Sequence, residues 1–285
     1  MCTSSTPNKC KKVSKTKKEK KERRVFLTTC VLNRSQMSFE NKVVVVTGGS
    51  SGIGAATAVL FAKEGASVVI VGRNEAKLKN VTERCQEHGA TPLVIKADVS
   101  VDEAAADIIK QTIDKYGKLD VLVNNAGIAS TGGLLDGELM KTYDKVLNTN
   151  LRAVVNLTAL AVPYLLKTKG NIINISSTLG TQVNPWMTSY CISKAGLEHF
   201  SKTAALELAP SGVRVNIVSP GPVVTDILES AGMPDMWDEW GKATPLGKVA
   251  HADEVADLIF FLASKIWHIR GDLLQITLDE LKEMR

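Results

Sequence analysis

The segment spanning residues 43–63 constrains the fold more than any other part of the chain. It begins with Val43-Val44-Val45-Val46, a β-branched run that is typical of a strand buried on both faces. The glycine-rich stretch Thr47-Gly48-Gly49-Ser50-Ser51-Gly52-Ile53-Gly54 follows, and a helical pattern continues to Lys63. Glycines permit a tight turn and close backbone approach to a pyrophosphate, and a helix N-terminus offers free N–H groups. This order of elements predicts a dinucleotide-binding turn.

Strand and helix patterns alternate six times along the chain. Strands are expected at 43–46, 68–71, 93–96, 119–123, 171–175 and 213–218, and helices at 75–87, 102–116, 139–167 (in one or more pieces) and around 190–210. This alternation predicts an α/β fold, a doubly wound parallel Rossmann-type sheet with helices on both faces. Ligands in such sheets bind outside the carboxyl ends of the strands. We therefore expect one edge of the sheet to gather Gly48, Arg73, Asp98, Asn125, Ser177 and Pro220.

The end of the second expected strand bears on the choice of nucleotide. Sites for NAD keep an acidic residue there, which hydrogen-bonds the ribose hydroxyls. The sequence reads Gly72-Arg73-Asn74 instead, and a guanidinium suits a 2′-phosphate. Arg73 therefore favours NADP(H) over NAD(H). The alternative is an ordinary exposed loop arginine.

Tyr190 and Lys194 are four residues apart, so they fall on one face of a helix. A free phenol titrates near pH ~10. A nearby ammonium favours the phenolate and lowers that pKa, so the pair would serve as a general acid or base. The alternative is a solvated helix face.

Five motifs occur in order and at consistent spacing. They are Thr-Gly-x-x-x-Gly-Ile-Gly at 47–54, Asn-Asn-Ala-Gly at 124–127, Ser177 thirteen residues before Tyr190, Tyr-x-x-x-Lys at 190–194 and Pro-Gly at 220–221. With them the chain resembles the short-chain dehydrogenase/reductase family over about residues 39–264. The resemblance is greatest to the 3-oxoacyl-carrier-protein-reductase-like group, which contains many unrelated substrate specificities.

The resemblance implies a catalytic role for four residues. Tyr190 would protonate a carbonyl oxygen as hydride arrives, or deprotonate an alcohol in reverse. Lys194 would lower the pKa of Tyr190 and hold the nicotinamide ribose. Ser177 would hydrogen-bond the substrate oxygen and stabilise developing charge. Asn150 would anchor a water-linked proton relay, with Asn148 as the second choice.

The resemblance also implies the cofactor contacts, and it implies no metal. Asp98 would bind the adenine amino group, Asn125 would lie along the cofactor, and Val223 and Thr225 would contact the carboxamide end. The full predicted cofactor-binding set is Gly48, Ser50, Ser51, Gly52, Ile53, Gly54, Arg73, Asp98, Val99, Asn125, Ala126, Gly127, Tyr190, Lys194, Pro220, Gly221, Val223 and Thr225.

Residues 223–245 correspond to the segment that covers the substrate in this family. A lipophilic ketone or alcohol fits its apolar side chains better than a sugar or an acid. The alternative is that these side chains pack the lid itself or a subunit contact. They are Ile227, Leu228, Met233, Met236, Trp237 and Trp240, to which Pro185-Trp186 adds.

Charge is unevenly spread. Residues 1–36 hold eleven Lys and Arg against two acidic residues, so they carry +9, and the net charge of +5 leaves −4 for residues 37–285. The Lys-rich tail is expected to be disordered. It is interpreted as a solvated or upstream extension of the domain at 37–285, with nuclear import as an alternative. The mildly acidic remainder argues against a nucleic-acid-binding surface.

Cysteine usage and hydropathy point to a cytoplasmic protein. The five cysteines are scattered and form no Cys-x-x-Cys pair, which fits a reducing compartment better than a disulfide framework. No apolar run reaches the ~18 residues that a membrane span needs.

The C-terminal segment departs from the family pattern. A helix is predicted at 252–263, but after Gly271 the strand-like stretch 272–279 lacks the usual Asp-Gly-Gly, and 278–285 looks helical and charged. The last strand is therefore in question, together with the subunit interface that it commonly builds.

The leading hypothesis is an NADP(H)-dependent oxidoreductase that acts on a small-molecule carbonyl/alcohol pair. It would work as a homo-oligomer, a tetramer or dimer, through long helices around 144–167 and 189–210. One alternative is a catalytically inactive nucleotide-binding regulator of the same fold. Another is a polyanion-binding protein that uses residues 9–24.

Overall fold

A seven-stranded parallel sheet forms the centre of the molecule, in the order β3-β2-β1-β4-β5-β6-β7. The computed structural model describes residues 38–135, 137–233, 235–264 and 275–277. The strands are β1 (Val43–Thr47), β2 (Ser67–Gly72), β3 (Leu93–Lys96), β4 (Val121–Asn124), β5 (Asn171–Ile175), β6 (Arg214–Ser219) and β7 (Gln275–Thr277).

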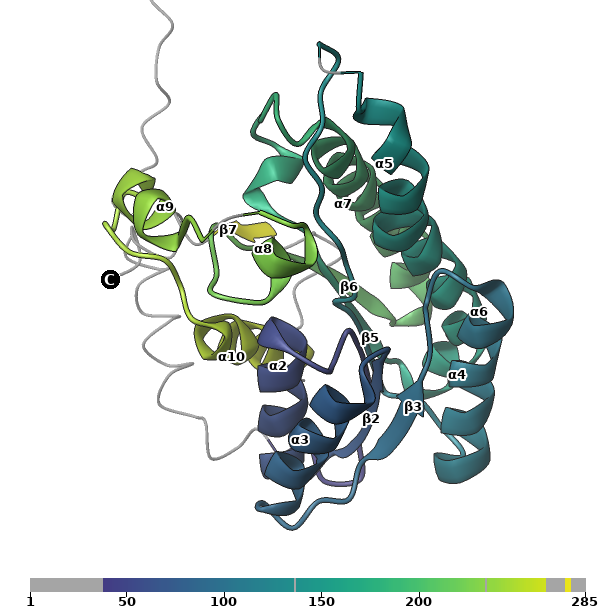
Figure 1. Ribbon diagram of the computed structural model, residues 1–285. Helices are drawn as coiled ribbons and strands as arrows, with labels where there is room; N and C mark the ends of the chain where they lie inside the picture. Colours follow the sequence, from purple (N-terminus) through teal and green to yellow (C-terminus); the bar gives the residue numbers. More distant parts are fainter. Residues whose placement is uncertain (1–37, 136, 234, 265–274, 278–285) are drawn as a thin grey trace, which may run out of the picture.

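Helices cover both faces of this sheet (Figure 1). Side chains alternate along β1, so that Val44 and Val46 pack into one hydrophobic core while Val43 and Val45 pack into the other. The first core is closed by α2 (Gly52–Lys63), α3 (Glu75–Gln86) and α10 (Ala252–Ala263), and the second by α4 (Asp102–Tyr116), α6 (Ala153–Thr168) and α7 (Thr188–Leu208).

Shorter elements complete the chain. Helix α5 (Leu139–Leu147) continues into α6 through the π-helical segment η2 (Asn148–Arg152). The 3₁₀ turns η3 (Thr178–Gly180) and η4 (Ala209–Ser211) flank α7, and the small helices α8 (Ile227–Ser230) and α9 (Trp237–Ala243) follow β6. None of the helices in the described ranges is long and apolar enough to cross a membrane.

The predicted α/β architecture is confirmed. All six predicted strands form, and the strand-like stretch at 272–279 contains β7, which pairs in parallel with residues 217–219 of β6. The last strand is therefore present. The disorder expected for residues 1–36 and the helix expected for 278–285 lie outside the described residues.

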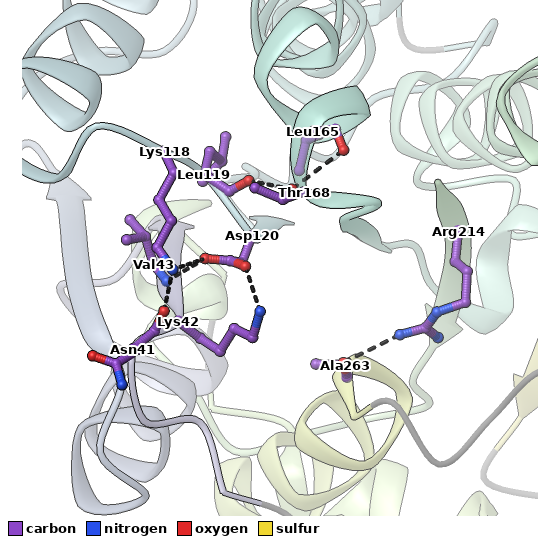
Figure 2. Close-up of polar contacts among 10 residues, drawn as sticks. All are labelled: Asn41, Lys42, Val43, Lys118, Leu119, Asp120, Leu165, Thr168, Arg214 and Ala263. Atoms are coloured by element: carbon purple, nitrogen blue, oxygen red, sulfur yellow. Dashed lines mark hydrogen bonds and ion pairs between the residues drawn. The ribbon is translucent and has the colours of Figure 1, made fainter. Parts of the chain in front are cut away.

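A buried carboxylate ties the amino ends of the strands together (Figure 2). Asp120, just before β4, is 5% exposed. Its Oδ1 accepts a hydrogen bond from Lys42 Nζ at 2.7 Å, and its Oδ2 accepts one from the Val43 amide at 3.0 Å. Lys118 Nζ lies 3.4 Å from the same Oδ2 and donates to the carbonyl of Asn41.

Arg214 connects β6 to the C-terminal end of α10. Its guanidinium donates to the carbonyls of Leu262 at 2.8 Å, Ala263 at 3.1 Å and Ser264 at 3.0 Å, and Figure 2 shows the Ala263 contact. Carbonyls in the last turn of a helix lack partners within the helix. Both the Asp120 cluster and this cap lie at the amino ends of the strands, so they leave the opposite edge to the candidate site.

Candidate active site

A cavity of about 940 Å³ lies at the carboxyl ends of the strands. It brings together residues from the ends of six strands that are far apart in the sequence. Every predicted site residue except Gly54 and Asn150 lines it. These lining residues are Gly48, Ser50, Ser51, Gly52, Ile53, Arg73, Asp98, Val99, Asn125, Ala126, Gly127, Ser177, Tyr190, Lys194, Pro220, Gly221, Val223 and Thr225.

The glycine-rich turn between β1 and α2 has the geometry of an anion cradle. Gly48 has a φ of +62°, and a Cβ there would stand 2.8 Å from the Cα of Ala126. A Cβ on Gly54 would stand 2.2 Å from the Gly48 carbonyl oxygen, so Gly54 allows the turn to close. Ser51 makes no side-chain cap bond to α2, and the first turn of α2 carries no acid. The N–H groups that begin α2 therefore suit a pyrophosphate.

Asn125 holds this turn in place. Its Nδ2 donates to the carbonyls of Thr47 at 2.9 Å and Gly48 at 3.2 Å. Its backbone amide donates to Thr47 Oγ1 at 3.0 Å, and the amide of Ala126 donates to the same hydroxyl at 3.1 Å. The ends of β1 and β4 are thereby bonded side by side at the cavity wall.

Arg73 projects from the end of β2 with its side chain 61% exposed, and Nη1 lies 3.6 Å from Asp98 Oδ2. Asp98 also accepts hydrogen bonds from Ser100 Oγ at 2.7 Å and from the Ser100 amide at 3.0 Å. Burial acts to raise the pKa of Asp98, but the Ser100 hydrogen bonds and the Arg73 charge outweigh it and lower that pKa overall. An exposed cation and a carboxylate with a lowered pKa thus flank the end of the cavity next to β2 and β3.

Sequence analysis missed two residues at this end, Asn74 and Lys77, which also line the cavity. Asn74 caps α3 by accepting a hydrogen bond from the Lys77 amide at 3.0 Å. Lys77 Nζ lies 2.7 Å from Asp226 Oδ2, in the segment that follows β6. Their position within one helical turn of Arg73 was a signal that could have identified them.

Three predicted catalytic residues meet at the other end of the cavity. Tyr190 is 7% exposed and Lys194 is 4% exposed, and both lie on α7. Ser177, directly before η3, hydrogen-bonds the Tyr190 phenol. Lys194 Nζ donates to the Ile175 carbonyl at the end of β5, at 2.8 Å, and lies 5.5 Å from the centroid of the Tyr190 ring.

The expected lowering of the Tyr190 pKa is wrong for this structure. Burial raises the pKa of Tyr190 to about 12, although the Ser177 hydrogen bond acts in the opposite direction. Burial also lowers the pKa of Lys194 to about 8. Desolvation penalises the charged form of each group. The Lys194 ammonium donates instead to the Ile175 carbonyl and lies over the Tyr190 ring.

Asn150 lies behind the cavity wall and is fully buried. Its Oδ1 accepts from the Ile128 amide at 2.9 Å, while Nδ2 donates to the Ile128 carbonyl at 2.9 Å and to Ser193 Oγ at 3.1 Å. A Cβ on Gly127 would be 3.4 Å from Asn150 Oδ1 and 3.6 Å from Lys194 Nζ, so these groups are neighbours. The rival Asn148 donates to Ser100 O at 3.4 Å instead.

The wall beyond Tyr190 is largely apolar. Of the predicted mouth residues, Ile227, Leu228, Trp237 and Trp240 line the cavity, whereas Pro185, Trp186, Met233 and Met236 do not. The rings of Trp237 and Trp240 pack edge to face at 5.6 Å. Sequence analysis missed the further lining residues Thr149, Leu179, Gln182, Val183, Asn184, Met187 and Leu246.

The fold and this cavity define a class of protein, the dinucleotide-binding α/β oxidoreductases. Comparison with known proteins identifies the family within this class. A family model described as enoyl-(acyl carrier protein) reductase matches residues 48–271. A Thermotoga maritima protein named 3-oxoacyl-[acyl-carrier-protein] reductase FabG is 39% identical over 232 residues, which are 80% of this chain and 92% of that protein. Its Chlamydia muridarum namesake is 36% identical over 83% of this chain and 96% of that protein.

Solved structures of related proteins are similar to this chain over most of its length. A Caenorhabditis elegans short-chain dehydrogenase/reductase of unknown function, crystallised with cofactor, has a TM-score of 0.79 and 36% identity, covering 84% of this chain and 94% of that one. A glucose dehydrogenase of C. elegans in the apo form has a TM-score of 0.72 and 37% identity, covering 84% and 97%. The chain belongs to the short-chain dehydrogenase/reductase family.

Proposed function

We propose that this chain is an NADP(H)-dependent oxidoreductase that interconverts a carbonyl and a secondary alcohol on a lipophilic small molecule. The observation that carries the proposal is a single cavity that gathers the glycine-rich turn, Arg73 and the trio Ser177, Tyr190 and Lys194. Carbonyl/alcohol chemistry is consistent with the family. The nucleotide preference, the substrate class and the residue roles are inferred from the side chains that line the cavity.

Proton handling falls to the residues at the end of the cavity. A nicotinamide bound there would supply or accept the hydride. The Tyr190 phenol, neutral because burial raises its pKa to about 12, would donate a proton to the carbonyl oxygen. Ser177 would hydrogen-bond the same oxygen and stabilise its developing charge. Lys194 would hold the ribose, and Asn150 would support a proton relay from behind the wall.

Cofactor preference is argued from the adenosine end. The exposed guanidinium of Arg73 suits a 2′-phosphate, and Lys77, which pairs with Asp226, lines the same wall. Asp98, whose carboxylate lies 3.6 Å from Arg73, would accept a hydrogen bond from the adenine amino group. These features favour NADP(H) over NAD(H).

Substrate class is argued from this chain's own cavity, since the names of its relatives range from 3-oxoacyl-[acyl-carrier-protein] to glucose. Tyr190 packs in an apolar cluster with Leu179, Met187 and Ile227, and Trp240 also lines the cavity. Lys248, a cation that also lines the cavity, pairs with Glu254 at 3.0 Å. An apolar ketone fits this wall better than a sugar or a carboxylate.

The test is a fluorescence titration of the purified chain with NADPH and NADH, followed by NADPH oxidation with alkyl ketones and with sugars. We expect tighter binding of NADPH and oxidation with the ketones. Tyr190→Phe is expected to bind NADPH normally and to lose at least ~100-fold in turnover. Nucleotide binding without turnover on any ketone would favour the alternative, an inactive nucleotide-binding regulator.

A further inference from the structure

A buried carboxylate stands directly behind the catalytic residues. Glu198 lies on α7 four residues after Lys194, one helical turn further along, and is only 3% exposed. A buried carboxylate is strongly destabilising unless hydrogen bonds compensate its lost hydration. The proton-handling scheme above does not use this group.

The carboxylate is bonded to two strand ends at once. Glu198 Oε1 accepts hydrogen bonds from Ser176 Oγ at 3.2 Å and from Ser219 Oγ at 3.0 Å. Ser176 follows β5 and precedes the catalytic Ser177, whereas Ser219 ends β6 and precedes Pro220.

The backbone continues this connection. The Ser176 amide donates to the Val218 carbonyl at 2.7 Å, and the Thr178 amide donates to the Pro220 carbonyl at 2.9 Å. A Cβ on Gly180 would stand 2.6 Å from Glu198 Oε1, so the turn η3 packs closely against the carboxylate. Three segments of the cavity wall therefore meet at one oxygen atom.

We propose that Glu198 is a positioning residue that sets Ser177 and the Pro220-Gly221 segment in register with Tyr190 and Lys194. Helix α7 carries the acid/base pair, and the strand ends carry the groups that must face it. Glu198 is the side chain of α7 that accepts from both strand ends through one atom. This role rests on the proposed function of Ser177 and Tyr190.

Kinetics of three variants test the role. Glu198→Met keeps the side-chain volume and removes the acceptor, Glu198→Gln keeps an acceptor oxygen, and Glu207→Met makes the same change at an exposed site on α7. We expect Glu198→Met to lower kcat about 100-fold with KM and the Kd for NADPH changed less than about threefold. Glu198→Gln should recover most of kcat, and Glu207→Met should match the native chain.

Amide hydrogen exchange of the nucleotide-free chain provides a readout that needs no turnover. In Glu198→Met, amides 176–181 should exchange about tenfold faster, while those near the C-terminal end of α7 stay protected. If Glu198→Met does not fold, Ser219→Ala replaces it with the same expected direction.

The results distinguish the positioning role of Glu198 from the proposed oxidoreductase function. A folded Glu198→Met with native kcat, or with native exchange at 176–181, overturns the positioning role. Equal losses of kcat and NADPH affinity also overturn it, because they would indicate a general structural role. A third result is that the native chain reduces no ketone while amides 176–181 still exchange faster in Glu198→Met than in the native chain. That result would refute the proposed function and would leave the restraint of Glu198 on Ser177 supported.

Discussion

Lys194 sits where its own charge is disfavoured. Its ammonium is 4% exposed, and its one hydrogen bond among those described goes to the Ile175 carbonyl, so burial lowers its pKa to about 8. Tyr190 is disfavoured in the opposite sense, with its pKa raised to about 12. Burial therefore disfavours the charged form of both groups in the nucleotide-free fold. Because both pKa values differ between the folded and the unfolded chain, these two groups make the free energy of unfolding depend on pH.

The pH dependence of the free energy of unfolding follows from the directions of the Lys194 and Tyr190 pKa shifts. Between pH ~8 and ~10.5 the unfolded chain binds the Lys194 proton more tightly than the folded chain, so the free energy of unfolding rises with pH. Tyr190 opposes this above pH ~10, where the unfolded chain loses its proton first. We expect Lys194 to contribute a rise of about 2 kcal/mol between pH 7.5 and 9.5.

Urea unfolding at pH 7.5, 8.5 and 9.5 measures this contribution. Lys194→Met should be more stable than the native chain at pH 7.5 and should lack the rise. Lys202→Met, at an exposed position of the same helix, should keep it. A rise that persists unchanged in Lys194→Met would show that the ammonium is not destabilised by burial.

Arg73 is the residue on which the proposed preference for NADPH depends. Arg73→Ala should weaken NADPH binding about 10- to 100-fold, because a charge-assisted hydrogen bond to the 2′-phosphate is worth roughly 1.5–3 kcal/mol. NADH binding should change by less than about twofold. Isothermal titration with both nucleotides measures the ratio, and Lys79→Ala on α3, which does not line the cavity, is the matched control. An unchanged ratio would refute the 2′-phosphate site.

The helix or strand that carries a site residue determines where its side chain lies, more than its neighbours in the sequence do. The π-helical segment η2 interrupts the path from α5 to α6 and directs Asn150 at Ile128 and Ser193, whereas Asn148 turns to Ser100. Such a bulge is frequent at functional sites. It explains why two asparagines two residues apart have different surroundings.

Topology made much of the site predictable. Parallel strands end at one edge, so the residues that follow them, such as Arg73, Asn125 and Ser177, could be grouped from the strand pattern alone. The pKa of Tyr190 and the buried position of Glu198 could not be predicted, because both depend on burial by segments remote in sequence. Asn150 was selected by resemblance, and its separation from the cavity surface became visible only in the fold.

The opposite edge of the sheet should control stability without affecting nucleotide binding. Asp120→Ala leaves Lys42 and Lys118 without their shared acceptor and removes the partner of the Val43 amide. We expect a loss of about 2–4 kcal/mol in the free energy of unfolding, with an unchanged Kd for NADPH. Asp114→Ala, at an exposed ion pair on α4, should cost less. Weaker NADPH binding in Asp120→Ala would contradict the separation of the two edges.

In the molecule as a whole, Phe39 is the first buried residue that the structure describes. Its ring lies 4.9 Å from that of Phe61 and 4.8 Å from that of Phe260, which joins the chain's first described residues to α2 and α10. Deleting residues 1–36 should leave Tm and NADPH affinity unchanged. Phe39→Ala should lower the free energy of unfolding by about 3–5 kcal/mol.

Thermal unfolding of the chain without residues 1–36 and of Phe39→Ala tests these two predictions. A large loss of Tm on deletion of 1–36 would mean that the basic segment contributes to the fold. Homo-oligomer formation stays a prediction, and sedimentation of the same deleted chain measures it in parallel.

The central claim is direct hydride transfer between NADPH and a ketone. The most direct measurement is reduction of an alkyl ketone with NADPH that carries two deuterium atoms at C4 of the nicotinamide, followed by mass spectrometry of the alcohol. We expect one deuterium on the carbinol carbon, and no alcohol above background from Tyr190→Phe. An alcohol without deuterium, or no alcohol from any ketone despite bound NADPH, would contradict it.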